Sequence, residues 1–238
     1  MKIMSIIQTN QSQWIEFKIK VPFYKQSSFS NIKIALRDQL GFGLFAQVFA
    51  CEAIIGKSEF HPVVKIIPID QHLFKEESKE EEMKDNPTTV DEFNDEAKLS
   101  QFMGENQIGP RVWVYDVMSF DKNDERISKL KLKDEIQGKC KFGMIVMDRL
   151  QYSYSQYREL INGHFMEKQY KQQIRTMFEN QALKAFRLAV VHGDLHSGKN
   201  IMLNVDNDLK PTLLKIIDWG IVFTPEQLFA VSINEVIE

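Results

Sequence analysis

Apolar positions in the first 147 residues follow the periods that β-strands show. Residues 13–24 alternate between apolar and polar side chains, the pattern of a strand with one buried face. Residues 32–40 lead into a tight turn at Gly41-Phe42-Gly43. Short apolar runs that predict further strands cover 48–55, 62–68, 112–117 and 142–147.

Helical spacing dominates the rest of the chain. Two short strands are also expected there, 200–204 and 212–217, on either side of an Asp-Asn-Asp turn. We therefore expect an α+β protein with a strand-rich part over 1–147 and a reduced helical part over 148–238. The predicted helices run from Thr89 or Asp91 to Met103, over 154–163, over 166–190 and from Pro225 to Val231.

Two charged segments interrupt this pattern. Residues 72–90 are acidic and poor in apolar side chains, which predicts a solvated helix or a disordered insert. Residues 121–138 are rich in Lys and Asp and are expected to form a hairpin loop.

Composition narrows the class of protein. A length of 238 residues, 43% of them hydrophobic, suits one large domain or two small lobes. The net charge of −3 argues against nucleic acid or an anionic membrane surface as the main partner, and no segment predicts a membrane span. Cys51 and Cys140 are too few for a disulfide framework and too far apart for a metal knuckle. Cys51 is expected to be a buried free thiol, in keeping with a reducing, cytoplasmic location.

Two features of the first part could bind phosphate. The glycines of Gly41-Phe42-Gly43 would let backbone N–H groups approach phosphate oxygens, although two glycines in a hairpin more often form an ordinary turn. Lys65 lies in an otherwise apolar strand, where it either points to water at a sheet edge or holds phosphates in a cleft. The second role needs a carboxylate, for which Glu96 is the first candidate and Glu92 the second.

Three polar residues of the second part could carry out phosphoryl transfer. Asp194 follows the long predicted helix, and an aspartate there can orient and deprotonate an attacking hydroxyl. Asn200 and Asp218 offer hard oxygen ligands for Mg²⁺. Asp218 follows a buried strand, where an unpaired carboxylate is costly and a cation would offset that cost. His192 fits a structural, hydrogen-bonded role better than a catalytic one.

These residues, in this order, resemble the motifs of the protein-kinase superfamily over about residues 35–222. His192-Gly193-Asp194 is similar to the catalytic loop, and Asp218-Trp219-Gly220 to the metal-binding triplet with Trp in place of Phe. Lys65 matches the lysine of the third strand and Glu96 its helix partner. The nucleotide-covering loop is matched by Gly41, Gly43, Ala46 and Val48, with Ala46 in place of a third glycine.

The resemblance also implies the contacts of the adenine base. Met147 would be the gatekeeper, and the backbone groups of Asp148 and Leu150 would meet the base. His196 stands where common Ser/Thr kinases have a lysine, and the spelling His-Gly-Asp-Leu-His is closer to aminoglycoside and choline phosphotransferases and to Rio-type and haspin-type kinases. His196 is accordingly counted with Asp194 among the catalytic residues.

One spacing differs from the family pattern. The family's metal-binding Asn comes five residues after the catalytic Asp, where this chain has Lys199. Asn200 leads directly into the following strand, so we expect a one-residue insertion near Gly198 and keep Asn200 as the ligand. If Lys199 fills the position instead, metal binding is impaired and a pseudokinase is expected.

The resemblance implies a bilobal kinase-like fold that binds ATP and Mg²⁺. Only residues 221–238 follow Gly220, so we expect neither a long activation segment nor a large helical subdomain. This favours a minimal, atypical Ser/Thr protein kinase with a protein substrate. The alternatives are a small-molecule kinase of the aminoglycoside-phosphotransferase type and a pseudokinase that acts as an interaction module.

Overall fold

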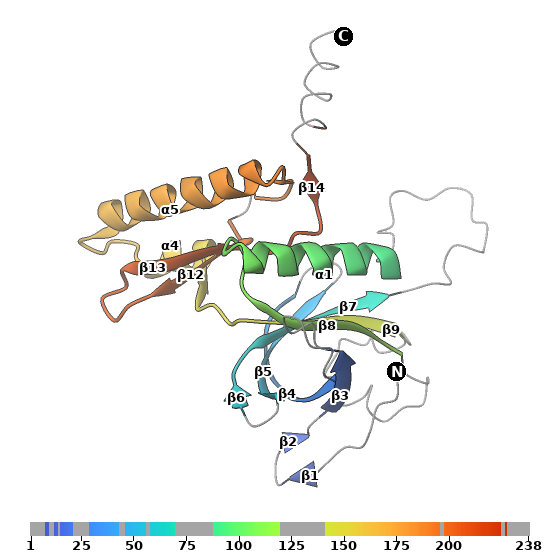
Figure 1. Ribbon diagram of the computed structural model, residues 1–238. Coiled ribbons are helices and arrows are strands. Elements are labelled where there is room, and N and C mark those ends of the chain that lie inside the picture. Colours follow the sequence, from blue (N-terminus) through green and yellow to red (C-terminus); the bar gives the residue numbers. More distant parts are fainter. Residues whose placement is uncertain are drawn as a thin grey trace, which may run out of the picture. The chain divides into compact units, whose positions relative to one another are not determined.

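The structure is a computed structural model of the whole chain (Figure 1). It describes residues 8–9, 12–13, 15–20, 29–42, 46–55, 58–69, 88–119, 141–195, 198–224 and 227, with side chains from Lys33 onward except those of Phe42, Ile55 and Ser58. These residues form a mixed α+β structure with antiparallel sheets and three helices, so the expected fold class is confirmed at this level. The chain divides into two compact units, Met1–Ala97 with Val112–Arg149 and Lys98–Arg111 with Leu150–Glu238.

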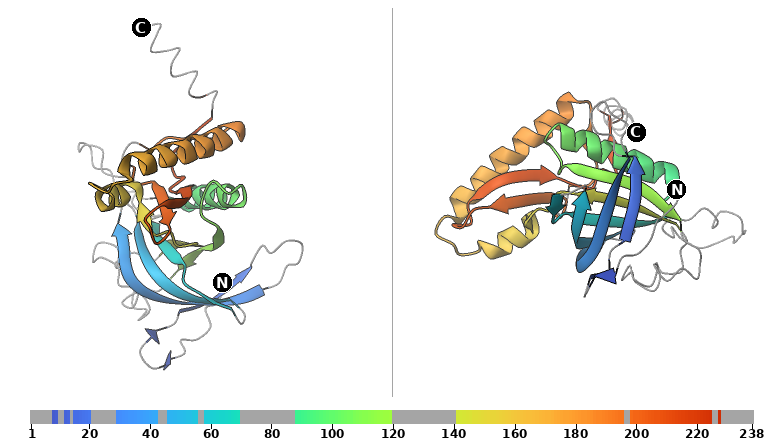
Figure 2. Two further views of the ribbon diagram at one scale, coloured as in Figure 1. Left: turned by 90° about the vertical axis from the view of Figure 1, so that its left-hand side faces the viewer. Right: turned by 60° about the horizontal axis from the view of Figure 1, so that its bottom comes forward.

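A seven-stranded antiparallel sheet forms most of the first unit. Its strand order is β3-β4-β5-β7-β9-β8, and β6 pairs with β5. Two bulges between Leu36 and Gly41 interrupt β4, which is a long curved strand in Figure 2. A separate short pair consists of β1 (Gln8–Thr9) and β2 (Ser12–Gln13). The strands of the large sheet are β3 (Ile15–Lys20), β4 (Phe29–Phe42), β5 (Gln47–Ile55), β6 (Ser58–Phe60), β7 (Val63–Ile69), β8 (Val112–Ser119) and β9 (Lys141–Met147).

The strand period of two gives this sheet two buried faces. On β7, Val64 and Ile66 belong to a core shared with the other strands, whereas Ile67 and Ile69 pack with Phe93 and Ala97 of helix α1 (Val90–Glu105). Gly143 on β9 allows this helix to approach the sheet closely, because a Cβ at that position would lie only 2.2 Å from Cδ2 of Phe93. Lys65 therefore lies on the face that α1 covers.

Helix α1 has defined signals at both ends. Its first turn is closed by a capping box, in which the Glu92 backbone N–H donates to Oγ1 of Thr89 and the Thr89 N–H donates to the Glu92 carboxylate. At its C-terminus the N–H of Ile108 reaches the carbonyl of Met103, and Gln107 adopts a positive φ of 61°. The helix is two residues longer at this end than the sequence predicts.

Gln47 is a buried polar residue that the sequence pattern does not reveal. Its side chain is 1% exposed on the same face as Phe49, and within the described residues neither its Nε2 nor its Oε1 has a hydrogen-bond partner. A buried amide without partners costs about 1–3 kcal/mol.

Replacing Gln47 with methionine should therefore stabilise the first unit. We expect the free energy of unfolding to rise by about 1–2 kcal/mol, because a thioether of similar shape needs no hydrogen bond. Thermal unfolding followed by circular dichroism measures the change. Gln39→Met is the matched control, since Gln39 is exposed on β4 and should gain nothing. A lower Tm for Gln47→Met would contradict the argument.

Cys51 is buried, as the sequence predicts. Burial raises the pKa of its thiol to about 12, so the thiolate is scarce at neutral pH and the side chain behaves as a small apolar group. Cys140 lies outside the described residues.

The second unit joins a small sheet to two helices. Its sheet has the order β10-β12-β13, and α5 packs along β13 (Figure 2). Tyr157 and Tyr170 donate from α4 and α5 to the carbonyls of Leu209 and Asp208, at 2.6 Å and 3.2 Å, and so anchor the β12–β13 turn. Burial raises the pKa of Tyr157 to about 12, which keeps this donor protonated. The elements are β10 (Tyr152–Ser153), α4 (Tyr154–Leu160), α5 (Glu167–Arg187), β12 (Ile201–Val205) and β13 (Pro211–Ile216).

A second, two-stranded sheet in this unit carries the candidate catalytic loop. Its strands are β11 (Val191–His192) and β14 (Val222–Phe223), which pair antiparallel. The N–H of Gly193 extends the pairing by donating to the carbonyl of Ile221 at 2.8 Å. The segment before Asp194 is thereby tied to the segment after Gly220.

Several sequence predictions fall outside the described residues. These are the hairpin loop at 121–138, residues 72–87 of the acidic segment, and all of the Pro225–Val231 helix apart from Gln227. Both helices of the second unit are shorter than predicted, since α4 ends at Leu160 and α5 at Arg187. A Schellman motif ends α5, with Ala189 at φ 58° and the N–H of Val190 on the carbonyl of Ala185.

Candidate functional site

Lys65 and Glu96 form a largely buried ion pair in the first unit. The Lys65 Nζ lies 2.6 Å from Oε1 of Glu96, and the two side chains are 13% and 12% exposed. The helix period that buries Phe93 and Ala97 turns Glu96 toward the same face of the sheet. Glu92, the other candidate partner, is used in the helix cap instead.

The glycine-containing hairpin adjoins this pair. Gly41 is paired with Val48, and Val48 is in turn directly opposite Lys65 on β7. A Cβ added to Gly41 would meet nothing within 4 Å, so packing does not require glycine at that position. Ala46 packs against the core beneath α1. Gly43 lies outside the described residues.

The segment after β9 is where the sequence predicts contact with adenine. Met147 ends β9 and packs against the core beneath α1. Oδ1 of Asp148 accepts a hydrogen bond from the indole N–H of Trp113 at 2.7 Å. Leu150, the third predicted contact, begins the part of the chain assigned to the second unit. Sequence reasoning missed Trp113, whose only signal is a tryptophan within a short predicted strand.

In the second unit a closed ring of hydrogen bonds surrounds the candidate catalytic loop. His192 Nδ1 accepts from the backbone N–H of Asp194 at 3.0 Å, and His192 Nε2 lies 2.9 Å from the carbonyl of Ile217. Nδ1 therefore acts as an acceptor and Nε2 as a donor, which defines a neutral imidazole. His192 has the structural role that the sequence predicts.

Asn200 closes the ring from the other side. Its Nδ2 donates to the backbone carbonyl of Asp194 at 2.7 Å and to the Asp194 Oδ2 at 3.0 Å. The backbone carbonyl of Asn200 accepts a hydrogen bond from the backbone N–H of Ile217 at 2.9 Å. The ring fixes the side chain of Asp194 and places Asn200 beside the residue that precedes Asp218.

Gly198 is the glycine near which the sequence predicts a one-residue insertion. Its φ of +66° is one that glycine adopts without strain, and its N–H approaches the carbonyl of Leu195 at 3.5 Å. Asn200 is 8% exposed and bonded to Asp194, whereas Lys199 is exposed.

Asp218 has an unusual backbone conformation. Its φ is +66°, and no helix end accounts for it, in contrast to Gln107 and Ala189. The next residue, Trp219, is 2% exposed and donates from Nε1 to the carbonyl of Ile216 at 3.1 Å. The buried indole also packs edge-on against His192, with ring centroids 4.8 Å apart. Trp219 thus holds Asp218 in a strained, exposed position, and strain of this kind often accompanies function.

Two residues near this ring could supply oxygen ligands to a cation, Asn200 through its amide oxygen and Asp218 through its carboxylate. Among the described residues, no group of three or more His, Cys, Asp or Glu side chains could hold a metal ion by itself. Mg²⁺ is commonly held by one or two carboxylates together with substrate phosphates, so this sparse donor set fits that ion. His196 lies outside the described residues.

No protein-family model and no curated protein sequence matches the chain. Within the described residues, no helix has the length and apolar character needed to cross a membrane.

Proposed function

We propose that the chain is an ATP-dependent phosphotransferase with a bilobal, protein-kinase-like fold, and that it acts as an atypical Ser/Thr protein kinase. The observation that carries the proposal is the hydrogen-bond ring His192–Ile217–Asn200–Asp194, which adjoins Asp218. In this ring the side chains of His192 and Asn200 bind the backbone N–H and the backbone carbonyl of Asp194. An ordinary solvated loop has no need to fix an aspartate in this way. The Lys65–Glu96 pair supports the same reading independently.

The first unit would bind the nucleotide. Lys65, oriented by Glu96, would hold the α- and β-phosphates through its ammonium group. Gly41 has open space where a side chain would stand, which would let phosphate oxygens approach the backbone of the hairpin. The backbone of Asp148 would meet the adenine base.

The second unit would activate the acceptor and hold the metal. The Asp194 carboxylate would accept the proton of the attacking hydroxyl as that oxygen bonds to the γ-phosphorus and the bond to the β–γ bridging oxygen breaks. Asn200 Oδ1 and the Asp218 carboxylate would hold Mg²⁺. When bound, the ion neutralises charge on the transferred phosphoryl group. Most of the rate enhancement would come from positioning and electrostatics.

Transfer of labelled γ-phosphate from ATP to a protein mixture, with and without Mg²⁺, tests the proposal. Magnesium-dependent labelling of protein Ser or Thr is expected. Labelling confined to small-molecule acceptors would indicate a small-molecule kinase. Nucleotide binding without any transfer would indicate a pseudokinase.

Substitution of the two adjacent loop residues tests which of them serves the metal. Asn200→Ala should raise the half-saturating Mg²⁺ concentration by about 10- to 100-fold, because it removes an oxygen ligand and the side chain that orients Asp194. Lys199→Ala is the matched control and should stay within about twofold of wild type, since surface changes have small effects. Titration of kcat against Mg²⁺ gives both values. An unchanged half-saturating Mg²⁺ concentration in Asn200→Ala together with a lower one in Lys199→Ala would place Lys199 in the metal position, where its ammonium group impairs metal binding.

A further inference from the structure

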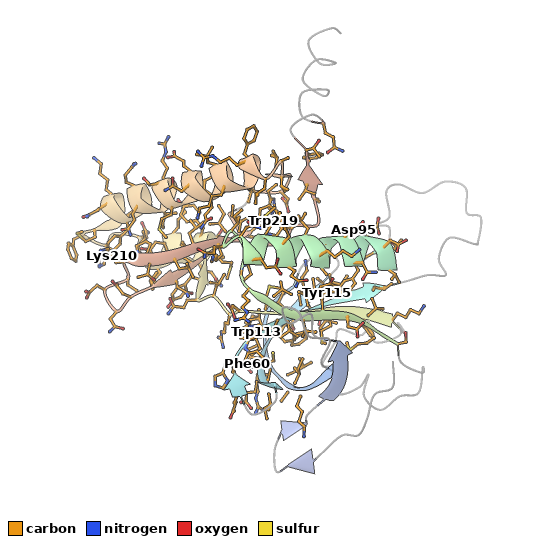
Figure 3. The ribbon with its side chains drawn as sticks, in the orientation of Figure 1. Phe60, Asp95, Trp113, Tyr115, Lys210 and Trp219 are labelled. Carbon is orange, nitrogen blue, oxygen red and sulfur yellow. The ribbon has the colours of Figure 1, made fainter. Side chains whose placement is uncertain are left out.

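Trp113 is the extra residue of a β-bulge. On β8, Val112 pairs with Met147 and Val114 with the preceding residue of β9, Val146, so the register of the two strands shifts by one residue at Trp113. Bulges of this kind re-aim a side chain and are common beside functional sites. Here the indole lies next to the ring of Phe60 (Figure 3), with ring centroids 4.6 Å apart. Its Nε1 donates to Oδ1 of Asp148 at 2.7 Å.

Asp148 directly follows β9 and begins an irregular segment. In such a segment an aspartate side chain commonly accepts a hydrogen bond from a nearby backbone N–H instead. Aspartate at the start of a turn readily accepts a hydrogen bond from the backbone N–H two residues later. At this position that donor is the N–H of Leu150, one of the groups predicted to meet the adenine base. A carboxylate bound there would compete directly with the nucleotide.

We propose that Trp113 is a positioning residue for nucleotide binding: its indole N–H holds the Asp148 carboxylate and so keeps the backbone after β9 available to the base. The inference rests on the proposed function, because it assigns a role at the same adenine site. A tryptophan suits the task, since its rigid ring is packed against Phe60 and its Nε1 can only donate.

The test compares ATP affinity in variants of the full chain. Trp113→Phe keeps a ring beside Phe60 but removes the donor, and we expect the Kd for Mg-ATP to rise about fivefold to tenfold, the loss of one hydrogen bond. The KM for ATP should rise in parallel while kcat stays within about twofold, because the catalytic loop is untouched. A merely structural role would lower Tm without this split.

The decisive variant is the double substitution Trp113→Phe with Asp148→Ala. Because it removes the competing carboxylate, it should recover most of the affinity that Trp113→Phe loses. Phe60→Leu, which keeps the indole donor, is the control and should lower Tm while leaving the Kd within about twofold. Should Trp113→Phe fail to fold, Trp113→Met, which also lacks a donor, provides the same comparison with and without Asp148→Ala.

Each outcome has a separate meaning. Wild-type protein that does not bind Mg-ATP would overturn the proposed function and this inference with it. Wild-type binding with an unchanged Kd in Trp113→Phe, or a loss that persists in the double variant, would overturn the inference alone. A loss that the double variant recovers would establish Trp113 as a positioning residue.

Discussion

Replacing Asp194 with asparagine is expected to lower kcat for phosphoryl transfer by on the order of 10³-fold, because a general base contributes about 10² to 10⁴. An amide cannot take the proton of the attacking hydroxyl. The backbone N–H of Asp194 would still donate to His192, and its carbonyl would still accept from Asn200. The ring and the fold should therefore survive, and the Kd for Mg-ATP should remain within about threefold of wild type.

Single-turnover transfer of labelled phosphate measures the rate, and isothermal titration calorimetry measures ATP affinity. The matched control is Asp208→Asn, which makes the same chemical change in the exposed β12–β13 turn of the same unit and should leave both quantities unaltered. If wild type and Asp194→Asn label substrates equally, Asp194 is not the base.

The faces on which Lys65 and Glu96 lie could be predicted from the sequence, because the local strand and helix periods determine them. Strand alternation puts Lys65 on the face opposite Val64 and Ile66, and the helical period that buries Phe93 and Ala97 points Glu96 toward the sheet. Both patterns can be read within a few residues. The sequence left open whether Lys199 or Asn200 takes the metal position, and the exposure of Lys199 beside a buried Asn200 appears only in the structure.

Features that depend on long-range register could not be anticipated. The bulge at Trp113 exists only because β8 and β9 pair in one register, and the hydrogen bond from His192 to Ile217 joins residues 25 apart in sequence. The burial of Gln47 depends on the neighbours of β5 across the sheet. A single sequence shows which side chains are polar, but the partners of each appear only when distant segments meet.

The positive φ of Asp218 is the most informative feature that the sequence did not reveal. It allows an effect of substitution on activity to be separated from an effect on stability. Glycine adopts this conformation freely, whereas an L-residue pays about 1–2 kcal/mol for it. Strained backbone conformations of this kind cluster at functional sites, where the strain can be part of the mechanism.

Asp218→Gly is therefore expected to raise the free energy of unfolding by about 0.5–1 kcal/mol, after allowance for the greater freedom of glycine in the unfolded chain. The same change should lower magnesium-dependent transfer by on the order of 10³-fold, because it removes the proposed metal ligand, and such a ligand is worth several kcal/mol in the transition state. Urea unfolding and the transfer assay measure the two effects, which have opposite signs.

Two further variants separate the effect of losing the carboxylate from the effect of relieving the backbone conformation. Asp218→Ala removes the carboxylate but keeps the strained backbone, so its activity should match that of Asp218→Gly while its stability falls below it by about 1 kcal/mol. Ala189→Gly relieves the same positive φ at the end of α5 and should gain stability without loss of activity. Equal stability of Asp218→Gly and Asp218→Ala would mean that Asp218 stores no backbone strain. Full activity of both Asp218 variants would show that Asp218 is not a metal ligand.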